Sequence, residues 1–383
     1  MTDTTQEIKN GFSNLSFGEI WDKYLRLKRI DYYIIVKFLG TFFLSIALII
    51  SIAVVFDVSE KIDDFMEKNA PLRAIVFDYY LNFIPYFSNL FSPLFTFISV
   101  IFFTSKMAEN SEIIAIQASG ISFHRLIRPY MISAGIIAVM TFILSGYVIP
   151  HANETRLNFQ EVYIKSRQFS NIARVQMEVS PGKILYLDYF DKNANRAYRA
   201  SLEKFDGKTL VSRMTAEILE WDSAYQWTAR KYMIRDFDGM YEKLTTGTVI
   251  DTIIPVEPSE FFIYKGMYEQ MGNDDLKTYI DKQKNRGVGN IKEFEIEYEK
   301  RFAFPFAAFI LTIIGVSLSS KKIKGGMGLN LGIGLLISFS FILFNTVSST
   351  FAVSGSLSPF MAVWLPNTLY AVVAAYLYRR APK

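Results

Sequence analysis

The residues best suited to a specific interaction lie in a short polar segment, 105–122, between two long apolar stretches. Alanine, isoleucine, glutamine and glutamate predict a helix there, and Gly120 stands where helices often end in a left-handed residue. Small side chains beside Ile113 would give this helix a face that a groove in another protein can accept. An ordinary connector between two membrane helices is the alternative. The residues expected to make the contact are Ser111, Glu112, Ile113, Ala115, Gln117 and Gly120.

No arrangement of side chains in the sequence predicts catalysis or a metal centre. The chain has no cysteine, and its two histidines, His124 and His151, are too few and too far apart for a histidine-based metal site. The motifs of phosphate loops, zinc proteases and dinucleotide-binding folds are also absent. We therefore expect a protein that is not an enzyme and that holds no cofactor or metal of its own.

A glycine-rich stretch at 325–334 superficially resembles a nucleotide loop, but it lacks the lysine that would meet phosphate. Gly328 and Gly332 are four residues apart and share one helix face, as do Asn330 and Gly334. Small residues at this spacing allow membrane helices to approach closely. The stretch therefore predicts close packing against another helix, in this chain or in a partner subunit.

Membrane helices must position the residues of the segments 105–122 and 325–334. A helix needs about 20 apolar residues to cross the hydrocarbon core of a bilayer. The stretches without Asp, Glu, Lys or Arg are 38–56, 79–105, 129–150, 302–320 and 325–378, the last long enough for two crossings. The sequence thus predicts six membrane helices, with a polar block between the third and the fourth.

Charge predicts the orientation of these helices. Lysine and arginine gather before the first span, between spans two and three, between spans four and five, and at the end of the chain. The loop at 57–67 on the opposite side is acidic. By the positive-inside rule both termini are cytoplasmic, and the polar block lies in the periplasm of a bacterium. The net charge of +4 is too small to suggest nucleic-acid binding, and the polar first 33 residues do not form a cleavable signal peptide.

The polar block predicts β-structure. Asp206-Gly207 and Asp238-Gly239 separate alternating apolar and polar segments, which is the strongest short signal for a β-hairpin. We expect an antiparallel meander that curls into a sandwich or jelly roll. The fold class is therefore an α-helical membrane bundle of six transmembrane helices with an inserted periplasmic, all-β, jelly-roll-like domain.

The predicted organisation follows from these patterns. Residues 17–25 form an amphipathic pattern typical of a helix lying on the membrane surface. The predicted parts are a cytoplasmic segment at 1–33 with that helix, spans one to three at 34–150, the β domain at 151–272, a helical connector at 273–300, and spans four to six at 301–383.

Several of these features together resemble one family. The string Ser111-Glu112-Ile113-Ile114-Ala115-Ile116-Gln117-Ala118-Ser119-Gly120 is similar to the coupling-helix region of the LptF/LptG family of lipopolysaccharide-export permeases. Its Gln-Ala-Ser-Gly sequence is more similar to the LptG members of the family than to the LptF members. Further matching positions are Asp31-Tyr32-Tyr33-Ile34, Phe91-Ser92-Pro93-Leu94, Pro150, and the spaced residues Leu276, Tyr279, Ile280, Gly287, Tyr298 and Pro305.

The resemblance implies a permease subunit without its own ATPase, working in an ABC-type transporter. Its implied partners are a second LptF/LptG-type permease, a cytoplasmic LptB-like ATPase dimer that holds ATP and magnesium, an LptC-like jelly-roll protein and an LptA-like bridge. The implied substrate is lipopolysaccharide, extracted from the bacterial inner membrane and passed toward the outer membrane. The coupling residues at 111–120 would dock on the ATPase, and the Gly328/Gly332 face would line the dimer seam or a lateral gate.

In one respect the sequence departs from the family pattern. Some relatives place a lysine near the outer end of the first span, facing lipid A phosphates, whereas the same region here reads Ala53-Val54-Val55-Phe56-Asp57. Cations are the natural partners of phosphate. The candidates for this contact are Lys61, Arg73, Arg156 and Lys37, although Lys37 is also placed to snorkel to the headgroups and the others to pair with nearby carboxylates.

Two other classes of membrane protein fit part of the sequence. An ATPase-coupled mechanotransmitter acting on a periplasmic partner would also need a coupling helix, but such proteins more often have four spans. A secondary transporter usually keeps an ionisable residue at mid-membrane, and the predicted spans lack one.

Overall fold

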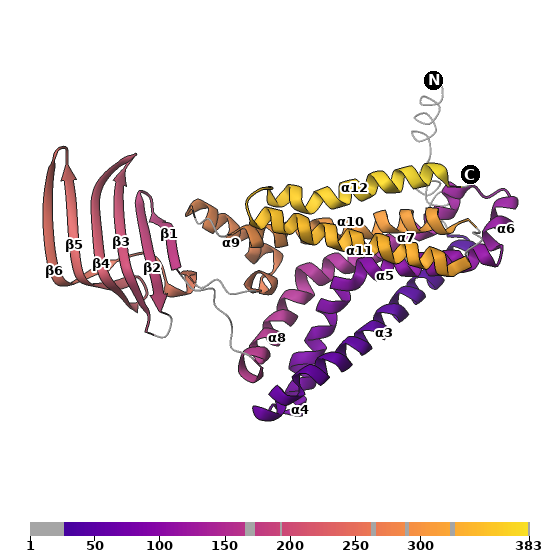
Figure 1. Ribbon diagram of the computed structural model, residues 1–383, viewed down its shortest axis with the longest axis horizontal. Helices are drawn as coiled ribbons and strands as arrows, with labels where there is room; N and C mark the ends of the chain where they lie inside the picture. The colour runs from indigo at the N-terminus through magenta and orange to yellow at the C-terminus, as the bar shows by residue number, and fades with distance from the viewer. Residues whose placement is uncertain are drawn as a thin grey trace, which may run out of the picture.

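The computed structural model describes residues 27–164, 173–191, 194–261, 266–287, 291–321 and 326–381. The amphipathic helix expected at 17–25 lies outside these residues. Six helical stretches are long and apolar enough to cross a membrane, as the sequence predicts. An antiparallel sheet is inserted between the third and the fourth (Figure 1).

The first three spans are longer than the uncharged stretches. The first is α3 (Arg29–Glu67); the second consists of α4 (Leu72–Ala74), the π-helix η2 (Ile75–Tyr80) and α5 (Leu81–Glu109). The third consists of α7 (Phe123–Ile143), the π-helix η3 (Leu144–Val148) and α8 (Ile149–Tyr163). The boundary expected at 150 therefore falls inside a helix, because charged residues end the apolar run without interrupting the backbone hydrogen bonds.

The last three spans are α10 (Lys292–Ser319), α11 (Gly326–Val353) and α12 (Pro359–Arg380). At the centre of the bundle, α5 and α10 pack on each other and on most of the other spans. In the most apolar window of each of these two helices, 56% of the residues are buried, against 22% in α3 and α11. Consequently α3 and α11 lie at the periphery, with long apolar faces uncovered in this chain.

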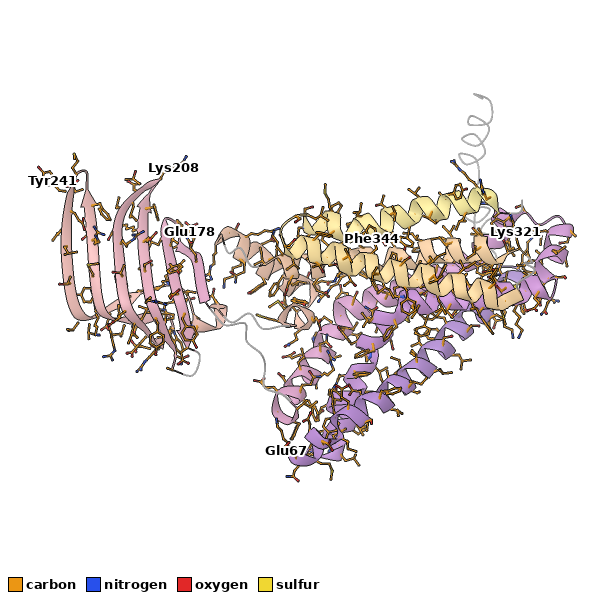
Figure 2. The ribbon with its side chains drawn as sticks, in the orientation of Figure 1. Glu67, Glu178, Lys208, Tyr241, Lys321 and Phe344 are labelled. Carbon is orange, nitrogen blue, oxygen red and sulfur yellow. The ribbon has the colours of Figure 1, made fainter. Side chains whose placement is uncertain are left out.

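A short helix, α6 (Glu112–Ala118), connects the second span to the third. It lies at the end of the bundle where α12 finishes, and the sheet lies beyond the opposite end (Figure 1). We name these the α6 end and the sheet end. Lys321 marks the α6 end, and Glu67 marks the far end of α3, on the sheet side (Figure 2).

The sheet contains six strands that pair in chain order. They are β1 (Ala173–Ser180), β2 (Lys183–Asp191), β3 (Arg196–Asp206), β4 (Thr209–Ser223), β5 (Gln226–Asp238) and β6 (Tyr241–Ile253). The two predicted hairpins are present, with Gly207 and Gly239 both left-handed at φ near +60°. Sequence reasoning missed β1.

The inserted β domain is confirmed, but its described strands form one open meander without the crossovers of a jelly roll. One face of the sheet is a core around Leu185, Leu187 and Trp227, completed by Ile254 and Val256 just after β6. Trp227 donates its indole N–H to the carbonyl of Val256 at 3.1 Å. The chain after β6 therefore folds back over the apolar face.

Three short elements return the chain to the membrane: η4 (Pro258–Phe261), η5 (Met267–Gln270) and α9 (Asn273–Asn285). The helix predicted from residue 273 and stopped by Gly287 is confirmed, since Gly287 is left-handed at φ +67°.

Candidate functional site

The predicted coupling segment is two helices rather than one. Helix α5 continues to Glu109, and Ser111 then adopts a left-handed conformation (φ 62°) that turns the chain into α6. Gly120 is left-handed, as predicted, and a β-carbon added there would meet no other atom within 4 Å. The turn at 110–111 lets α6 lie across the end of the bundle instead of extending the second span.

The side chains of α6 divide into an inner and an outer group. Ile113 is 1% exposed and packs in the bundle core, so it holds α6 to the bundle and does not face outward. Ile114 is 56% exposed and was not among the predicted contact residues. The other residues on the outer surface are Ser111, Ala115, Ala118, Ser119 and Gly120, while Gln117 is half-buried.

Glu112 is half-buried and contacts two neighbouring side chains. It accepts a hydrogen bond from the hydroxyl of Tyr33 at 3.3 Å and one from the amide of Asn110 at 3.2 Å. The carboxylate therefore also holds α6 to the first turns of α3.

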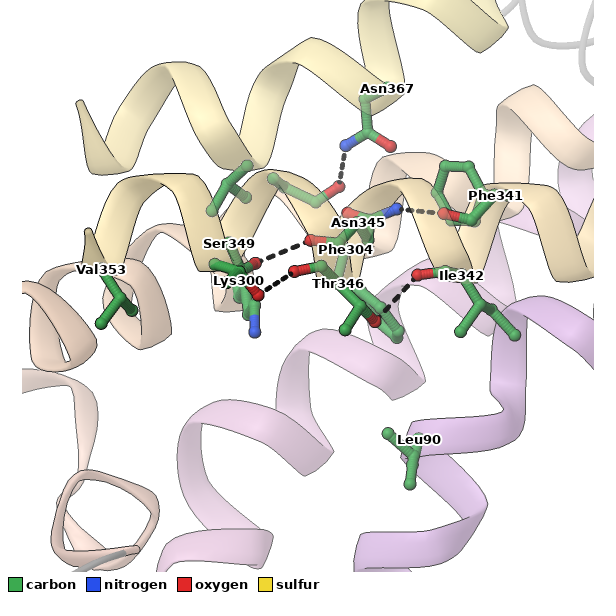
Figure 3. A pocket seen from close by; sticks show the side chains of 13 residues that line it. Leu90, Lys300, Phe304, Phe341, Ile342, Asn345, Thr346, Ser349, Val353 and Asn367 are labelled. Atoms are coloured by element: carbon green, nitrogen blue, oxygen red, sulfur yellow. Dashed lines mark hydrogen bonds between the residues drawn. The ribbon is translucent and has the colours of Figure 1, made fainter. Parts of the chain in front are cut away.

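At the sheet end a cavity of about 380 Å³ opens between α5, α10, α11 and α12 (Figure 3). Leu90 of α5 faces residues of α11 across it. The lining is mainly apolar, and its residues are Leu90, Lys300, Ala303, Phe304, Phe341, Ile342, Asn345, Thr346, Ser349, Thr350, Val353, Val363 and Asn367.

The polar groups of this cavity are mostly satisfied within their own helices. Asn345, Thr346 and Ser349 donate to backbone carbonyls one turn earlier. Asn367 donates to the carbonyl of Ala303 at 2.8 Å, but its side-chain oxygen is buried without a partner among the described residues. Lys300 is the cation of the lining. Such a cavity suits the apolar part of an amphiphile, with an anionic group near Lys300.

The four candidate phosphate contacts do not gather in one place. Lys37 and Lys61 stand 24 residues apart on α3, about 36 Å along the helix axis. Lys61 already pairs with Asp57 at 2.5 Å and with the hydroxyl of Tyr79. Arg156 is buried, with its guanidinium 4.7 Å from the ring centre of Tyr86. Arg73 is exposed.

The glycine-rich start of α11 has two faces with different surroundings. Asn330 is buried and donates to the hydroxyl of Ser105 at 3.0 Å. A β-carbon on Gly334 would collide with the Cδ1 atom of Ile101, so this face packs closely on α5. A β-carbon on Gly328 or Gly332 would meet nothing within 4 Å. The predicted close packing within the chain thus uses the Asn330/Gly334 face, and the Gly328/Gly332 face is uncovered.

A buried polar cluster at the sheet end was not predicted from the sequence. Arg301 of α10 is 2% exposed and donates to the carbonyls of Tyr268 and Met271 and to the side chain of Asn273. Burial, together with the nearby carboxylate of Glu297, raises the pKa of Glu269 to about 7, against the opposing charges of Arg156, Lys300 and Arg301. The cluster joins the connector from the sheet to the third and fourth spans.

Within the described part of the chain, no group of three or more His, Asp or Glu side chains could hold a metal ion. The family model described as lipopolysaccharide export system permease LptF/LptG matches residues 32–380, nearly the whole chain. A search among curated proteins gave no match.

Proposed function

This chain belongs to the LptF/LptG family of lipopolysaccharide export permeases, and we propose that it is one of two permease subunits of an ATP-driven transporter that extracts lipopolysaccharide from the inner membrane. The observation that carries the proposal is the family match over residues 32–380. Family and spans together make the chain a multi-pass inner-membrane protein.

The energy for extraction comes from a separate subunit. The sequence has no phosphate loop, and α6 presents exposed small residues and Ile114 at one end of the bundle. A helix of this kind suits insertion into a groove. An LptB-like ATPase dimer, holding ATP and magnesium, docks there on the cytoplasmic side. In this orientation both termini are cytoplasmic and the sheet is periplasmic.

A second permease of the same family covers the peripheral helices. Both α3 and α11 leave most of their apolar windows unburied, and the Gly328/Gly332 face of α11 is open. Small residues on an apolar helix favour close association with another helix.

Lipopolysaccharide, the transported substrate, binds in the cavity at the sheet end. Its acyl chains suit the apolar lining, and a phosphate suits Lys300, the cation of that lining. The sheet then passes the lipid to an LptC-like protein and an LptA-like bridge toward the outer membrane.

Purification and reconstitution of the full chain with its companions test this function. We expect a second permease and an ATPase to co-purify, and the reconstituted complex to release lipopolysaccharide from proteoliposomes only with ATP. A mechanotransmitter would co-purify with an ATPase but release no lipid. ATP hydrolysis by the chain alone, or normal delivery of lipopolysaccharide to the outer membrane after depletion of the chain, would refute the proposal.

A further inference from the structure

The start of α3, at the α6 end, contains a fully buried carboxylate. Asp31 is 0% exposed and receives a hydrogen bond from the backbone of Lys28 at 2.8 Å. Both of its oxygens are bound by Arg125 of α7, through Nη1 and Nη2 at 2.6 Å each. A two-point contact between a guanidinium and a carboxylate restricts both distance and orientation. The pair therefore fixes the start of α3 to the start of α7.

This contact lies close to one end of the coupling helix. Only residues 119–122 separate α6 from α7, and Ser122 caps α7 by accepting from the backbone of Arg125 at 3.3 Å. The other end of α6 is held to α3 as well, through the hydrogen bond from Tyr33 to Glu112. The start of α3 thus contacts the first residue of α6 through Tyr33 and the first turn of α7, which follows α6 in the chain, through Asp31.

Apolar packing completes this junction. Ile34 of α3 and Ile113 of α6 are both buried in one core cluster, together with Phe123 of α7. Farther along α3, the buried residues Phe38, Phe42, Ile46 and Ile50 form a single stripe of aliphatic and aromatic side chains. This packing holds the middle of α3, and the contact of Lys61 with Tyr79 holds its far end. At the α6 end, Asp31 and Tyr33 supply the polar contacts of the helix.

From this geometry we infer that Asp31, held by Arg125, is a positioning residue that makes α3 follow displacements of the coupling helix. The inference rests on the proposed function, since the ATPase is what displaces α6. Because α3 is a peripheral span with an uncovered apolar face, its movement would change the contact with the partner subunit or lipid.

The first test compares Asp31→Asn with Tyr32→Phe in the complete reconstituted complex. Tyr32 is the exposed neighbour on the same helical turn and serves as the matched control. In Asp31→Asn we expect lipopolysaccharide transferred per ATP hydrolysed to fall by about fivefold, with the ATPase still bound. Unchanged transfer per ATP would overturn the inference, as would a variant in which ATPase binding, hydrolysis and transfer all fall together.

A second measurement follows the movement itself. Since the chain has no cysteine, spin labels can be placed at Leu44→Cys on α3 and Leu336→Cys on α11, both exposed. We expect ATP binding to change the distance between the labels in the Tyr32→Phe control and to leave it nearly constant in Asp31→Asn. An equal change in both proteins would overturn the inference.

A third variant covers a failure to fold. If Asp31→Asn yields no folded chain, Arg125→Lys, which keeps the charge but cannot make the two-point contact, is measured in the same way and by the same criteria. A failure of the proposed function can be distinguished from a failure of this inference. If the proposed function is wrong, the unmodified complex itself transfers no lipopolysaccharide with ATP.

Discussion

At the scale of single residues, the outward position of Ile114 changes which side chain of α6 is expected to dock. Glu112 and Ile113 face the bundle, whereas Ile114 is exposed between Ala115 and the turn at Ser111. An apolar anchor in a groove commonly dominates a small interface.

Ile114→Asp should therefore release the ATPase from the purified complex, because a carboxylate would be buried without a partner. Affinity should fall at least about tenfold, measured by co-purification or by titration with the isolated ATPase. The control is Ile253→Asp, the same substitution at an exposed position on β6, at the opposite end of the molecule from α6. Equal ATPase retention in both variants would contradict the assignment of Ile114.

Glu269 gives a pH dependence that can be measured. Burial raises its pKa to about 7, above the ordinary glutamate value, so the folded protein favours the protonated form. The stabilising contribution of that form is complete below the ordinary pKa and is lost as pH rises through about 7.

Glu269→Gln should therefore raise the melting temperature at pH 8 and change it little at pH 4.5. The gain at pH 8 should reach at most about 3 kcal/mol in the free energy of unfolding. Thermal melts of the solubilised protein at both pH values check this, with exposed Glu154→Gln as the control. A gain of the same size at both pH values would show that the carboxylate does not titrate in this range.

At the scale of elements, α11 separates two uses of small residues on one helix. Its Asn330/Gly334 face packs on α5, and its Gly328/Gly332 face has open space. The two faces can be tested independently because substitutions on them meet different surroundings.

Gly334→Val should lower the melting temperature of the solubilised chain, since the added side chain collides with Ile101. Overpacking of this kind costs about 1–3 kcal/mol. Gly332→Val should leave the melting temperature of the isolated chain unchanged and weaken association with the second permease. Equal destabilisation by both substitutions would mean that the two faces are not distinct.

The connection between bundle and sheet is a second element-scale feature. Arg301 binds the η5–α9 segment through two carbonyls and Asn273, and a β-carbon on Gly146 of η3 would lie 2.5 Å from the side-chain nitrogen of Asn273. The third and fourth spans therefore meet the connector at one compact point, where a glycine is needed for close approach.

At the scale of the whole molecule, α6 and the sheet lie at opposite ends of the bundle (Figure 1). The positive-inside rule predicts that the α6 end is cytoplasmic, because lysines and arginines concentrate there in the sequence.

Labelling with a membrane-impermeant maleimide checks this orientation. In the cysteine-free chain, Met240→Cys at the tip between β5 and β6 should react in intact spheroplasts. Lys321→Cys, exposed at the α6 end outside α6 itself, should react only after permeabilisation. Reaction of Lys321→Cys in intact spheroplasts would reverse the orientation and remove the site proposed for the ATPase.

Features governed by local physics were correctly predicted from the sequence. The six spans depend on the length of apolar runs, and the turns at Gly120, Gly207, Gly239 and Gly287 depend on a residue that tolerates positive φ. The missed strand β1 also had a local signal, since Val175, Met177 and Val179 alternate with polar residues.

Which face of each helix is covered was decided only by the tertiary structure. Ile113 is buried, whereas the adjacent Ile114 is exposed. In the same way Gly334 packs against α5, whereas Gly332 has open space beside it. Asp31 and Arg125 meet across 94 positions, and the cavity lining comes from four separate helices. Most elements and their order could be predicted from the sequence, because hydropathy and backbone preference act over a few residues. The contacts between elements depend on how distant helices pack, and no short-range pattern in one sequence specifies that packing.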